Sequence, residues 1–304
     1  MTFDEFIKRF LREEQCRSYL YQLRWPNGFV CPKCKEATKA WPKGENLYEC
    51  PKCGHQTSVI AGTIFQDTRK PLQTWFTAIW WVTTQKNGAS AKGPQQILGL
   101  SSYKTAWTWL RKIRTAMVNP YRTKLSGTVE VDECYIGGEE HDGKRGRGTD
   151  NKSIVVIGVE LLEGKNQMGR VRMKVVPDAS GESLQGFIKE NIELGSTVIT
   201  DGWSGFASIG EKGYSHIVPK KFEVADEQNL LPHVHMIVSL LKRWLLGTRQ
   251  GAVQEMHLQA YLDEYAFRFN RRKAAQRGLL FYRLLECAIQ VPPTTLDDLL
   301  GHNL

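Results

Sequence analysis

The 304-residue sequence predicts an α/β protein, with a mixed sheet and helices in its second half and a cysteine-rich ribbon and a helical segment before them. Three observations support this fold class. Two CxxC pairs lie near the N-terminus, apolar residues recur at helical spacing over 72–117, and a period-two pattern typical of strands begins after Gly127. The predicted segments are an N-terminal helix (1–25), a ribbon (26–66), a helical segment (67–124), an α/β domain (125–285) and a tail (286–304).

The composition excludes two broad classes of protein. With 41% hydrophobic and 24% charged residues, the chain is neither disordered nor membrane-embedded. No stretch approaches the ~20 apolar residues that span a bilayer. The first residues, MTFDEFIKRFLREEQ, are charged throughout and contain no apolar signal core. We therefore expect a soluble, cytoplasmic protein with no membrane partner.

The net charge of +9 is unevenly distributed. Residues 1–125 hold 20 Lys and Arg against 8 Asp and Glu, whereas residues 126–304 hold 21 against 24. A basic half attracts phosphate backbones and releases their counterions on binding. The charge pattern thus favours nucleic acid as the partner of the first half and leaves carboxylates for a divalent cation in the second. Charge that serves solubility alone is the alternative.

Four of the seven cysteines form two pairs, Cys31-Pro-Lys-Cys34 and Cys50-Pro-Lys-Cys53, separated by fifteen residues. Each pair lets two thiolates converge from one tight turn, and two turns supply the four ligands of tetrahedral Zn²⁺. Because an all-thiolate set leaves no position for water, the zinc is expected to be structural. Two disulfides are the alternative, which a cytoplasmic location disfavours. The other three cysteines are expected as ordinary thiols or small core residues: Cys16, Cys134 and Cys287.

Three helices are expected between the ribbon and the sheet. LQTWFTAIWWVTTQ has helical apolar spacing, SAKGPQQIL fits a helix ended by Gly99, and YKTAWTWLRKIRTAM fits a third with Ser101 or Ser102 as N-cap. Two helices joined by a short turn, the second one basic, are typical of a DNA-binding helix-turn-helix. A structural bundle is the alternative. The basic residues expected off the apolar stripe are Lys104, Arg111, Lys112 and Arg114.

The second half predicts three strands, a helix and a fourth strand: TVEVDECYIGG, SIVVIGVELL, RVRMKVVPDA, ESLQGFIKENI and STVITDGWSGF. This order begins a ribonuclease-H-like fold, in which the first and fourth strands lie side by side. Asp132 in the first strand and Asp201 at the end of the fourth should therefore meet. Two such carboxylates repel unless they share a cation, and Mg²⁺ prefers oxygen ligands. A lone aspartate at a strand end is otherwise a common turn former.

A later helix, LPHVHMIVSLLKRWLLG, places three polar residues on one face: His235, Ser239 and Lys242. His235 could then point at a metal site, and Lys242 could face a phosphate. From spacing alone, a hydrogen-bonded surface or core histidine is the more common outcome.

The motifs CPKC…CPKCG, VDECYIGG, ITDGWSGF, HVHMIVSLLKRWLLGT and YLDEYAFRFNRR together resemble the zinc-ribbon transposases of bacterial insertion sequences, DDE enzymes of the ISXO2-like type. The resemblance spans about residues 15–285. It implies double-stranded DNA as partner, binding of terminal inverted repeats, and strand cleavage and transfer with Mg²⁺ or Mn²⁺ on a ribonuclease-H-like core. It also implies action at the nucleoid and a homo-oligomer, because transposition joins two ends.

The resemblance also implies a role for each site residue. Asp132 and Asp201 match the first two catalytic aspartates, and Lys242 matches the basic residue seven positions after the third member. His235 stands at that third position, usually Glu and in some branches Asn or His. A neutral imidazole suits Mn²⁺ better than Mg²⁺, so His235 is either a branch-specific ligand or a mark of an impaired copy. The alternative third ligands are Glu223, Asp226, Glu227, Glu255 and Glu264.

Other residues are candidates for holding DNA. Trp203 could stack on a flipped base, although packing is the more frequent use of Trp. Several basic residues could hold phosphates: Lys144, Arg145, Arg147, Lys220, Lys221, Arg268, Arg271, Arg272 and Lys273. For the last four of these, a solvated helix face is equally consistent with the sequence.

Two other functions fit part of the sequence. A DNA-binding regulator without catalysis explains residues 1–125 but leaves Asp132, Asp201 and Lys242 without a role. A metal-dependent nuclease of the same fold would cut DNA without strand transfer. A DNA transposase accounts for both halves of the chain.

Overall fold

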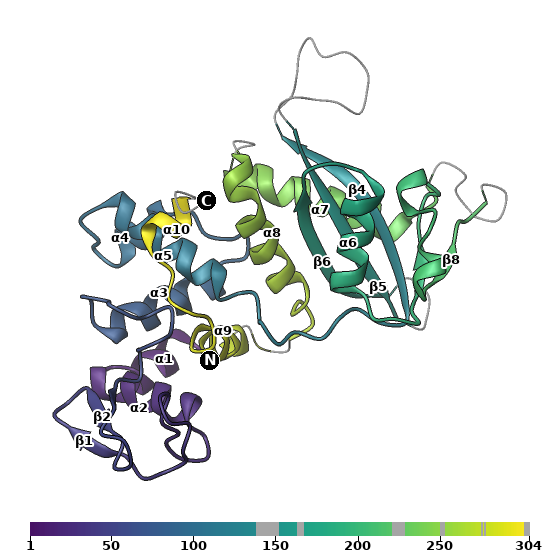
Figure 1. Cartoon of the computed structure of the whole chain (residues 1–304). Coiled ribbons are helices and arrows are strands. Elements are labelled where there is room, and N and C mark those ends of the chain that lie inside the picture. Colours follow the sequence, from purple (N-terminus) through teal and green to yellow (C-terminus); the bar gives the residue numbers. More distant parts are fainter. Residues whose placement is uncertain are drawn as a thin grey trace. The chain divides into compact units, whose positions relative to one another are not determined.

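The computed structural model describes residues 1–137, 152–162, 167–220, 229–249, 253–274, 276 and 278–300 (Figure 1). The chain forms two compact units. The first contains Met1–Pro120 and Ala274–Leu304, and the second contains Tyr121–Lys273. The C-terminal helices therefore belong with the N-terminal half, an arrangement that the sequence division did not include. Within the described residues, every helix is too short or too polar to cross a membrane.

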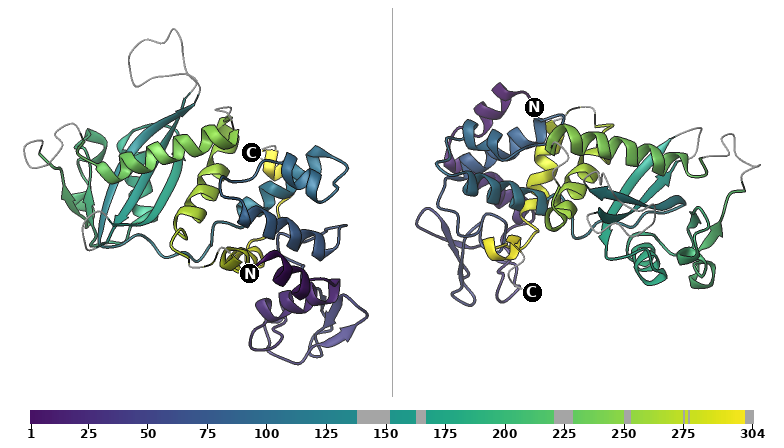
Figure 2. Two further views of the ribbon diagram at one scale, coloured as in Figure 1. Left: turned by 180° about the vertical axis from the view of Figure 1, so that it is seen from behind. Right: turned by 90° about the horizontal axis from the view of Figure 1, so that it is seen from above.

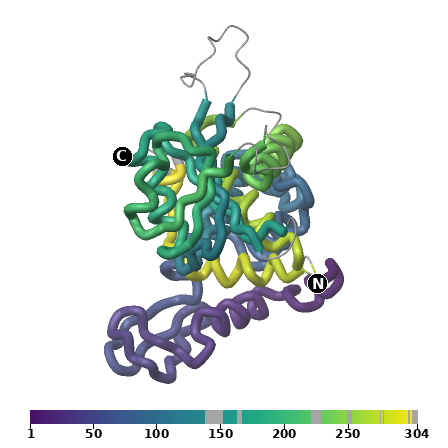
Figure 3. The backbone as a smooth tube through the Cα atoms, turned by 90° about the vertical axis from the view of Figure 1, so that its right-hand side faces the viewer, coloured from purple at the N-terminus to yellow at the C-terminus, as the bar shows by residue number. Residues whose placement is uncertain are grey.

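The first unit is mainly helical, and aromatic side chains form its core. Phe6, Phe10, Phe76 and Phe281 pack with ring centroids 5.0–5.8 Å apart, so segments from both ends of the chain meet (Figure 3). The helices of this unit are α1 (Phe3–Arg9), α2 (Glu13–Arg24), α3 (Leu72–Thr84), α4 (Lys92–Ile97), α5 (Tyr103–Thr115), α9 (Gly278–Ala288) and α10 (Leu296–Leu300).

Helices α3, α4 and α5 confirm the three predicted between the ribbon and the sheet. Ser102 caps α5 by accepting a hydrogen bond from the Lys104 backbone N–H. Gly99, with φ +59°, makes the turn between α4 and α5 in a conformation that favours glycine. Arg114 was expected off the apolar face of α5, and this was wrong. It is buried, and its guanidinium donates to the Ala89 carbonyl at 2.7 Å, which gives one of its donors a partner inside the unit.

The N-terminal ribbon is a three-stranded antiparallel sheet of very short strands. Its strands are β1 (Trp41–Lys43), β2 (Leu47–Glu49) and β3 (Gln56–Thr57), in the order β1-β2-β3. Helix α2 supports the ribbon through two ring contacts: Tyr21 lies 4.9 Å from Tyr48, and Trp25 lies 4.8 Å from Phe29. So small a sheet requires support from outside its own strands.

The second unit is built on a five-stranded mixed sheet of order β6-β5-β4-β7-β8. Strands β4 and β5, and β5 and β6, are antiparallel, whereas β4 and β7, and β7 and β8, are parallel. This confirms the α/β fold with a ribonuclease-H-like core and the adjacency of the first and fourth predicted strands. The strands are β4 (Thr128–Gly137), β5 (Lys152–Leu161), β6 (Met168–Val176), β7 (Thr197–Ile199) and β8 (Ser215–Ile217).

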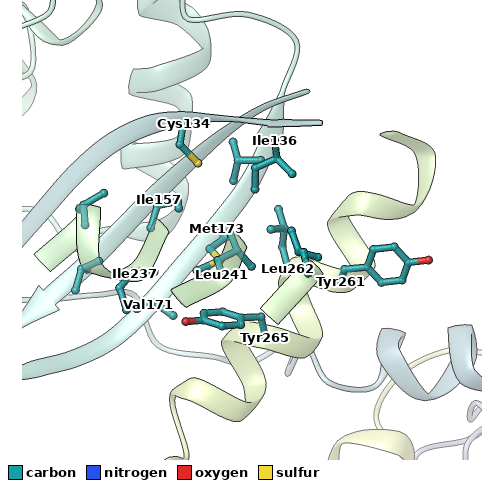
Figure 4. Packing of buried hydrophobic residues seen from close by; sticks show 14 of the residues in the cluster. Cys134, Ile136, Ile157, Val171, Met173, Ile237, Leu241, Tyr261, Leu262 and Tyr265 are labelled. Carbon is teal, nitrogen blue, oxygen red and sulfur yellow. The ribbon is translucent and has the colours of Figure 1, made fainter. Parts of the chain in front are cut away.

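Helices cover both faces of this sheet (Figure 2). Helix α6 (Gly181–Asn191) packs on the face that contains Val129 and Val131. Helices α7 (Pro232–Arg249) and α8 (Glu255–Phe269) pack on the opposite face, where Ile237 and Leu241 meet Ile157 (Figure 4). Since side chains alternate along β4, Glu130 and Asp132 point toward the α7 side. Two short 3-10 helices follow β7, at Ser204–Phe206 and Gly210–Lys212.

Helix α8 also protects the free edge of the sheet. The Asn270 side chain, just after α8, accepts from the Val171 N–H at 2.7 Å and donates to the Val171 carbonyl at 3.1 Å. Gln259 accepts from the Val175 N–H at 2.9 Å and donates to the Met173 carbonyl at 3.3 Å. These side chains pair backbone groups that an edge strand would otherwise expose, and they hold the C-terminal end of α8 against the start of β6.

Candidate functional site

The two CxxC pairs form matching turns. The Cys31 carbonyl accepts from the Lys35 N–H, and the Cys50 carbonyl accepts from the Gly54 N–H, each at 2.9 Å. The last residue of each turn is left-handed, with φ +63° at Lys35 and +67° at Gly54. Such turns present two sulfurs in one direction, as zinc knuckles require.

The four sulfurs converge on one point. Cys31 Sγ lies 3.6 Å from Cys53 Sγ, and Cys34 Sγ lies 3.7 Å from Cys50 Sγ, and all four are free thiols. A tetrahedron with Zn–S bonds of about 2.3 Å has edges of about 3.8 Å. The arrangement therefore fits a four-thiolate zinc ion and not two disulfides. The isolated Cys16, Cys134 and Cys287 are buried, as expected of core residues.

Asp132 lies within β4, and Asp201 follows the end of β7, the parallel neighbour of β4. In the parallel pair of β4 and β7, Glu130 lies opposite Ile199, and each aspartate follows two residues later. Asp201 is exposed in the turn after β7, where its Oδ1 accepts from the Trp203 N–H at 2.9 Å. Gly202 in this turn has φ +84° and approaches Val218 so closely that a Cβ would lie 2.8 Å from Val218 Cγ1. The turn is thus built for glycine and fixes Asp201 beside the end of β7.

His235 joins this pair from α7. Its Nε2 lies 3.3 Å from Asp132 Oδ2, and its Nδ1 lies 2.5 Å from Asn229 Oδ1. If Nδ1 carries the proton and donates it to Asn229, the Nε2 lone pair is directed toward Asp132. Metal-binding histidines are commonly oriented by such a hydrogen bond from the other ring nitrogen.

The electrostatics of Asp132 indicate a place for a cation. Burial and the neighbouring Asp201 carboxylate raise the pKa of Asp132 to about 6, against the opposing effects of the Glu133 backbone N–H and His235. A carboxylate that is destabilised by burial and by a like charge is relieved by a shared cation.

The donor set suits Mg²⁺ or, with its imidazole, Mn²⁺. The group of Asp132, Asp201 and His235 is less compact than the group of four cysteines. Among the residues that the structure describes, only the four cysteines bring three or more such ligand atoms within 4.8 Å of one another. The ligand atoms of Asp132, Asp201 and His235 are therefore spaced more widely than those of the four cysteines.

Lys242 lies two turns beyond His235 on α7 and is exposed. It is close enough to β4 to affect Cys134, whose pKa burial raises to about 12 while the Lys242 charge acts in the opposite direction. Cys134 follows Asp132 by two residues on the same face of β4. Lys242 is therefore on the side of the sheet that contains Asp132.

The structure adds one residue that the sequence analysis missed. Glu130 is only 4% exposed, and its carboxylate accepts from the backbone N–H groups of His233 at 3.0 Å and Val234 at 2.9 Å. It also lies 2.7 Å from His233 Nδ1. A carboxylate at a helix N-terminus satisfies free N–H groups and complements the helix dipole. Glu130 thereby ties the first turn of α7, and so His235, to β4. A second acid two residues before Asp132, on the same strand face, was the available sequence signal.

The other predicted candidates lie apart from this group or outside the described residues. Glu264 is fully buried and pairs with Arg268 at 2.9 Å, and Glu255 is exposed in the first turn of α8. Trp203 packs, and its indole N–H donates to the Ala179 carbonyl at 3.1 Å. Lys220 is exposed after β8. The candidates outside the described residues are Lys144, Arg145, Arg147, Lys221, Glu223, Asp226 and Glu227.

Comparison with known proteins matches both units. Residues 124–270 match the ISXO2-like transposase domain, and residues 11–57 match the transposase zinc-ribbon domain. The second match begins two residues before α2 and so includes Tyr21 and Trp25, which contact Tyr48 and Phe29 of the ribbon region. An uncharacterized protein in transposable element ISH50 of Halobacterium salinarum is 25% identical over 280 residues, which cover 86% of this chain and 92% of that protein. The chain therefore combines a transposase zinc-ribbon domain with an ISXO2-like transposase domain, in the order and positions where the structure places the ribbon and the five-stranded core.

Proposed function

We propose that this protein is the DNA transposase of an insertion sequence, which binds terminal inverted repeats and catalyses metal-dependent strand cleavage and strand transfer. The observation that carries the proposal is the grouping of Asp132, Asp201 and His235. Asp132 and Asp201 each lie two residues beyond the paired Glu130 and Ile199 of β4 and β7, and His235 Nε2 lies 3.3 Å from Asp132. Oxygen-rich groups of this kind serve phosphodiester chemistry in two-metal sites.

In this proposal Asp132, Asp201 and His235 hold Mg²⁺ or Mn²⁺. When bound, these ions supply Lewis-acid activation of a water or a 3′-hydroxyl and neutralise charge on the phosphate. Asp132 acts in its ionised form, and Asn229 keeps His235 turned toward it. Lys242, on the same side of the sheet, provides a positive charge for a phosphate of the bound strand.

Two successive displacements account for the reaction. Water attacks the phosphodiester at the element end, which releases a 3′-hydroxyl. That hydroxyl then attacks a target phosphodiester, so that one P–O bond forms as another breaks. No covalent bond between protein and DNA is required. Because two element ends must be joined to one target, the active form is expected to be a homo-oligomer.

The first unit would recognise the DNA. Its residues, 1–120 and 274–304, hold 20 Lys and Arg against 11 Asp and Glu. Helix α5 follows a tight turn after α4, as in a helix-turn-helix, and its first turn presents an exposed Tyr103 and Lys104. The zinc ribbon adds exposed basic residues around an exposed Trp41.

Labelled duplexes of the element ends, incubated with a target plasmid and Mn²⁺ or Mg²⁺, test the proposal. Joined products are expected. Cleavage without joining would instead identify a nuclease of the same fold, and binding without cleavage would identify a DNA-binding regulator. Either of these two results contradicts the proposed transposase activity.

Substitution of His235 separates a metal ligand from a surface histidine. His235→Ala should lower cleavage about 10–100-fold, the range for weakened metal sites. His235→Glu should restore cleavage and favour Mg²⁺, because carboxylate is the harder ligand. Ser239→Ala, one turn further on the same face, is the control. Full activity in His235→Ala would show that His235 is not a ligand.

Substitution of Glu130 tests the support of α7. Glu130→Gln keeps the size of the side chain but removes the charge beside two backbone N–H groups and His233. We expect a roughly 10-fold higher Mn²⁺ concentration for half-maximal cleavage, with DNA affinity unchanged. Glu264→Gln removes another buried carboxylate, on α8, and should leave the Mn²⁺ requirement unchanged. If the unsubstituted protein, Glu130→Gln and Glu264→Gln all need the same Mn²⁺ concentration for half-maximal cleavage, Glu130 has no positioning role.

A further inference from the structure

A second group of charged residues lies at the edge of the sheet, where α8 ends against β6. Asn270 is hydrogen-bonded to both backbone groups of Val171, and Arg272 donates to the carbonyl of Gly169 at 3.1 Å. These contacts bring the end of the YLDEYAFRFNRR motif, including Arg271, beside the first residues of β6. The function proposed above gives this motif no role.

Two arginines of β6 converge on the segment that leads into β4. Arg170 Nη1 donates to Thr123 Oγ1 at 2.7 Å, and Arg172 Nη2 donates to the Thr123 carbonyl at 2.9 Å. Arg122, the residue before Thr123, is exposed. The loop 122–124, β6 and the end of α8 therefore bring the backbone positions of four arginines together: Arg122, Arg170, Arg172 and Arg271. The Arg122 guanidinium donates to Asn191 Oδ1 at 3.5 Å, and that of Arg271 donates to the Phe267 carbonyl at 3.2 Å.

The cluster holds more positive than negative charge. Glu160 is bound by Arg170 at 2.6 Å, so that pair is internally balanced. Arg172 is only 7% exposed, and its hydrogen bonds reach the carbonyls of Val171 and Thr123. Burial lowers the pKa of Arg172 to about 10; the charges of Arg122, Arg170 and Arg271 act in the same direction, and the Glu160 carboxylate acts in the opposite direction. With four arginines around the single carboxylate of Glu160, the cluster keeps a surplus of positive charge that a bound anion would offset.

The cluster is separate from the Asp132 group. Val171 packs in the core shared with α7 and α8, so the alternating side chains of Arg170 and Arg172 point to the opposite face. Asp132 points to the α7 face of β4, and β5 lies between β4 and β6. An anion bound at the arginines is therefore not the phosphate that reacts at Asp132.

We propose that Arg122, Arg172 and Arg271 form an accessory site for a backbone phosphate of duplex DNA. Guanidinium groups suit phosphate because their planar donors match two phosphate oxygens. The site lies on the catalytic unit and would hold DNA beside the cleaved position, so this inference rests on the proposed function. Inorganic phosphate offers the same chemistry, and the experiment below distinguishes the two.

The test measures how DNA affinity depends on salt. The Arg122→Gln/Arg271→Gln variant and its parent, both carrying Asp132→Asn to prevent cleavage, bind an element-end duplex at several salt concentrations without added divalent cation. Each lost phosphate contact lowers the slope of log K against log salt by about 0.9, so a decrease of about 1–2 is expected. The matched control is Lys174→Gln/Lys189→Gln, which removes two exposed charges of the same unit, one of them already paired with Glu190. Its slope should equal that of the parent.

Three further measurements make the result specific. Arg122→Lys/Arg271→Lys should restore the slope, because counterion release depends on charge. The Gln variant should unfold no earlier than the parent, since the mutation relieves repulsion at Arg172. Inorganic phosphate that stabilises the parent while the duplex slope is the same in parent and Gln variant would identify a free-phosphate site and overturn the DNA assignment.

An unchanged slope and affinity in the Gln variant would overturn the inference altogether. An unchanged slope can be told apart from failure of the proposed function. The proposed function fails if the protein without substitutions does not cleave the DNA. Cleavage with an unchanged slope rejects only the arginine site. A reduced slope without cleavage retains the arginine site and rejects the catalytic assignment.

Discussion

Replacement of Asp132 by Asn is expected to abolish divalent-dependent DNA cleavage while DNA binding survives. Asn has the same shape as Asp but lacks the charge that would bind a cation together with Asp201 and His235. We expect a loss of roughly 10³-fold or more, equivalent to about 4 kcal/mol of transition-state stabilisation. Asp201→Asn should also lose cleavage, because the Asp201 carboxylate lies near Asp132 and raises its pKa.

A gel assay of end cleavage, combined with a binding titration on the same duplex, checks this prediction. Asp178→Asn is the control, since Asp178 is an exposed aspartate that accepts hydrogen bonds from Ser180 and Ser183 before α6. It should cleave normally. Unchanged cleavage in Asp132→Asn or Asp201→Asn would remove that residue from the proposed site, and lost binding would indicate a folding defect.

Loss of the zinc ligands is expected to unfold the ribbon and greatly weaken DNA binding. The strands of the ribbon contain three, three and two residues, and β1 is exposed along its whole length. Such a sheet has little core of its own, and four-thiolate zinc contributes about 10–16 kcal/mol in small domains. Cys50→Ser removes a fully buried ligand and should lose both the metal and the ordered turn at Gly54.

Metal analysis and amide hydrogen exchange over residues 30–57 measure this effect. The wild-type protein should contain one zinc per chain, and Cys50→Ser should contain much less and exchange rapidly across the ribbon. Cys287→Ser, also buried but remote from the zinc ligands in sequence, should retain the metal. Because a chelator would also remove catalytic cations, the cysteine variant is the cleaner test. Full zinc content in Cys50→Ser would contradict the four-thiolate assignment.

The parts of the molecule predicted correctly from sequence depend on short-range patterns. The spacing within and between the CxxC pairs specifies two matching turns, because each turn is complete within five residues. Ser102 caps α5 through an N–H two residues away, and the alternation in β4 predicts which residues share a face. The prediction that Asp132 and Asp201 meet was of a different kind. It required the strand order of the ribonuclease-H-like fold, in which the first and fourth strands are neighbours. The pairing of β4 with β7 confirmed that strand order.

Contacts between distant segments were decided only in the tertiary structure. Asp132 and His235 are separated by 103 residues, and no local pattern specifies that α7 would bring them within 3.3 Å. Glu130 was overlooked because its partners are the free N–H groups of a helix that starts a hundred residues later. Arg114 was misplaced because a charged side chain on a helix is expected in water unless a carbonyl, here that of Ala89, reaches it.

By itself, the sequence determined the composition of this protein's sites: four thiolates at zinc spacing, two strand aspartates, a histidine and lysine seven residues apart, and a late run of arginines. Ligand chemistry and local turns are properties of neighbouring residues, so they can be identified along the chain. The tertiary structure decided which of these groups meet. The pairing of β4 with β7 brought Asp201 near Asp132, Glu130 held α7 against β4, and Asn270 held the end of α8 against Val171 of β6. Such pairings depend on the packing of whole elements, which no single segment encodes.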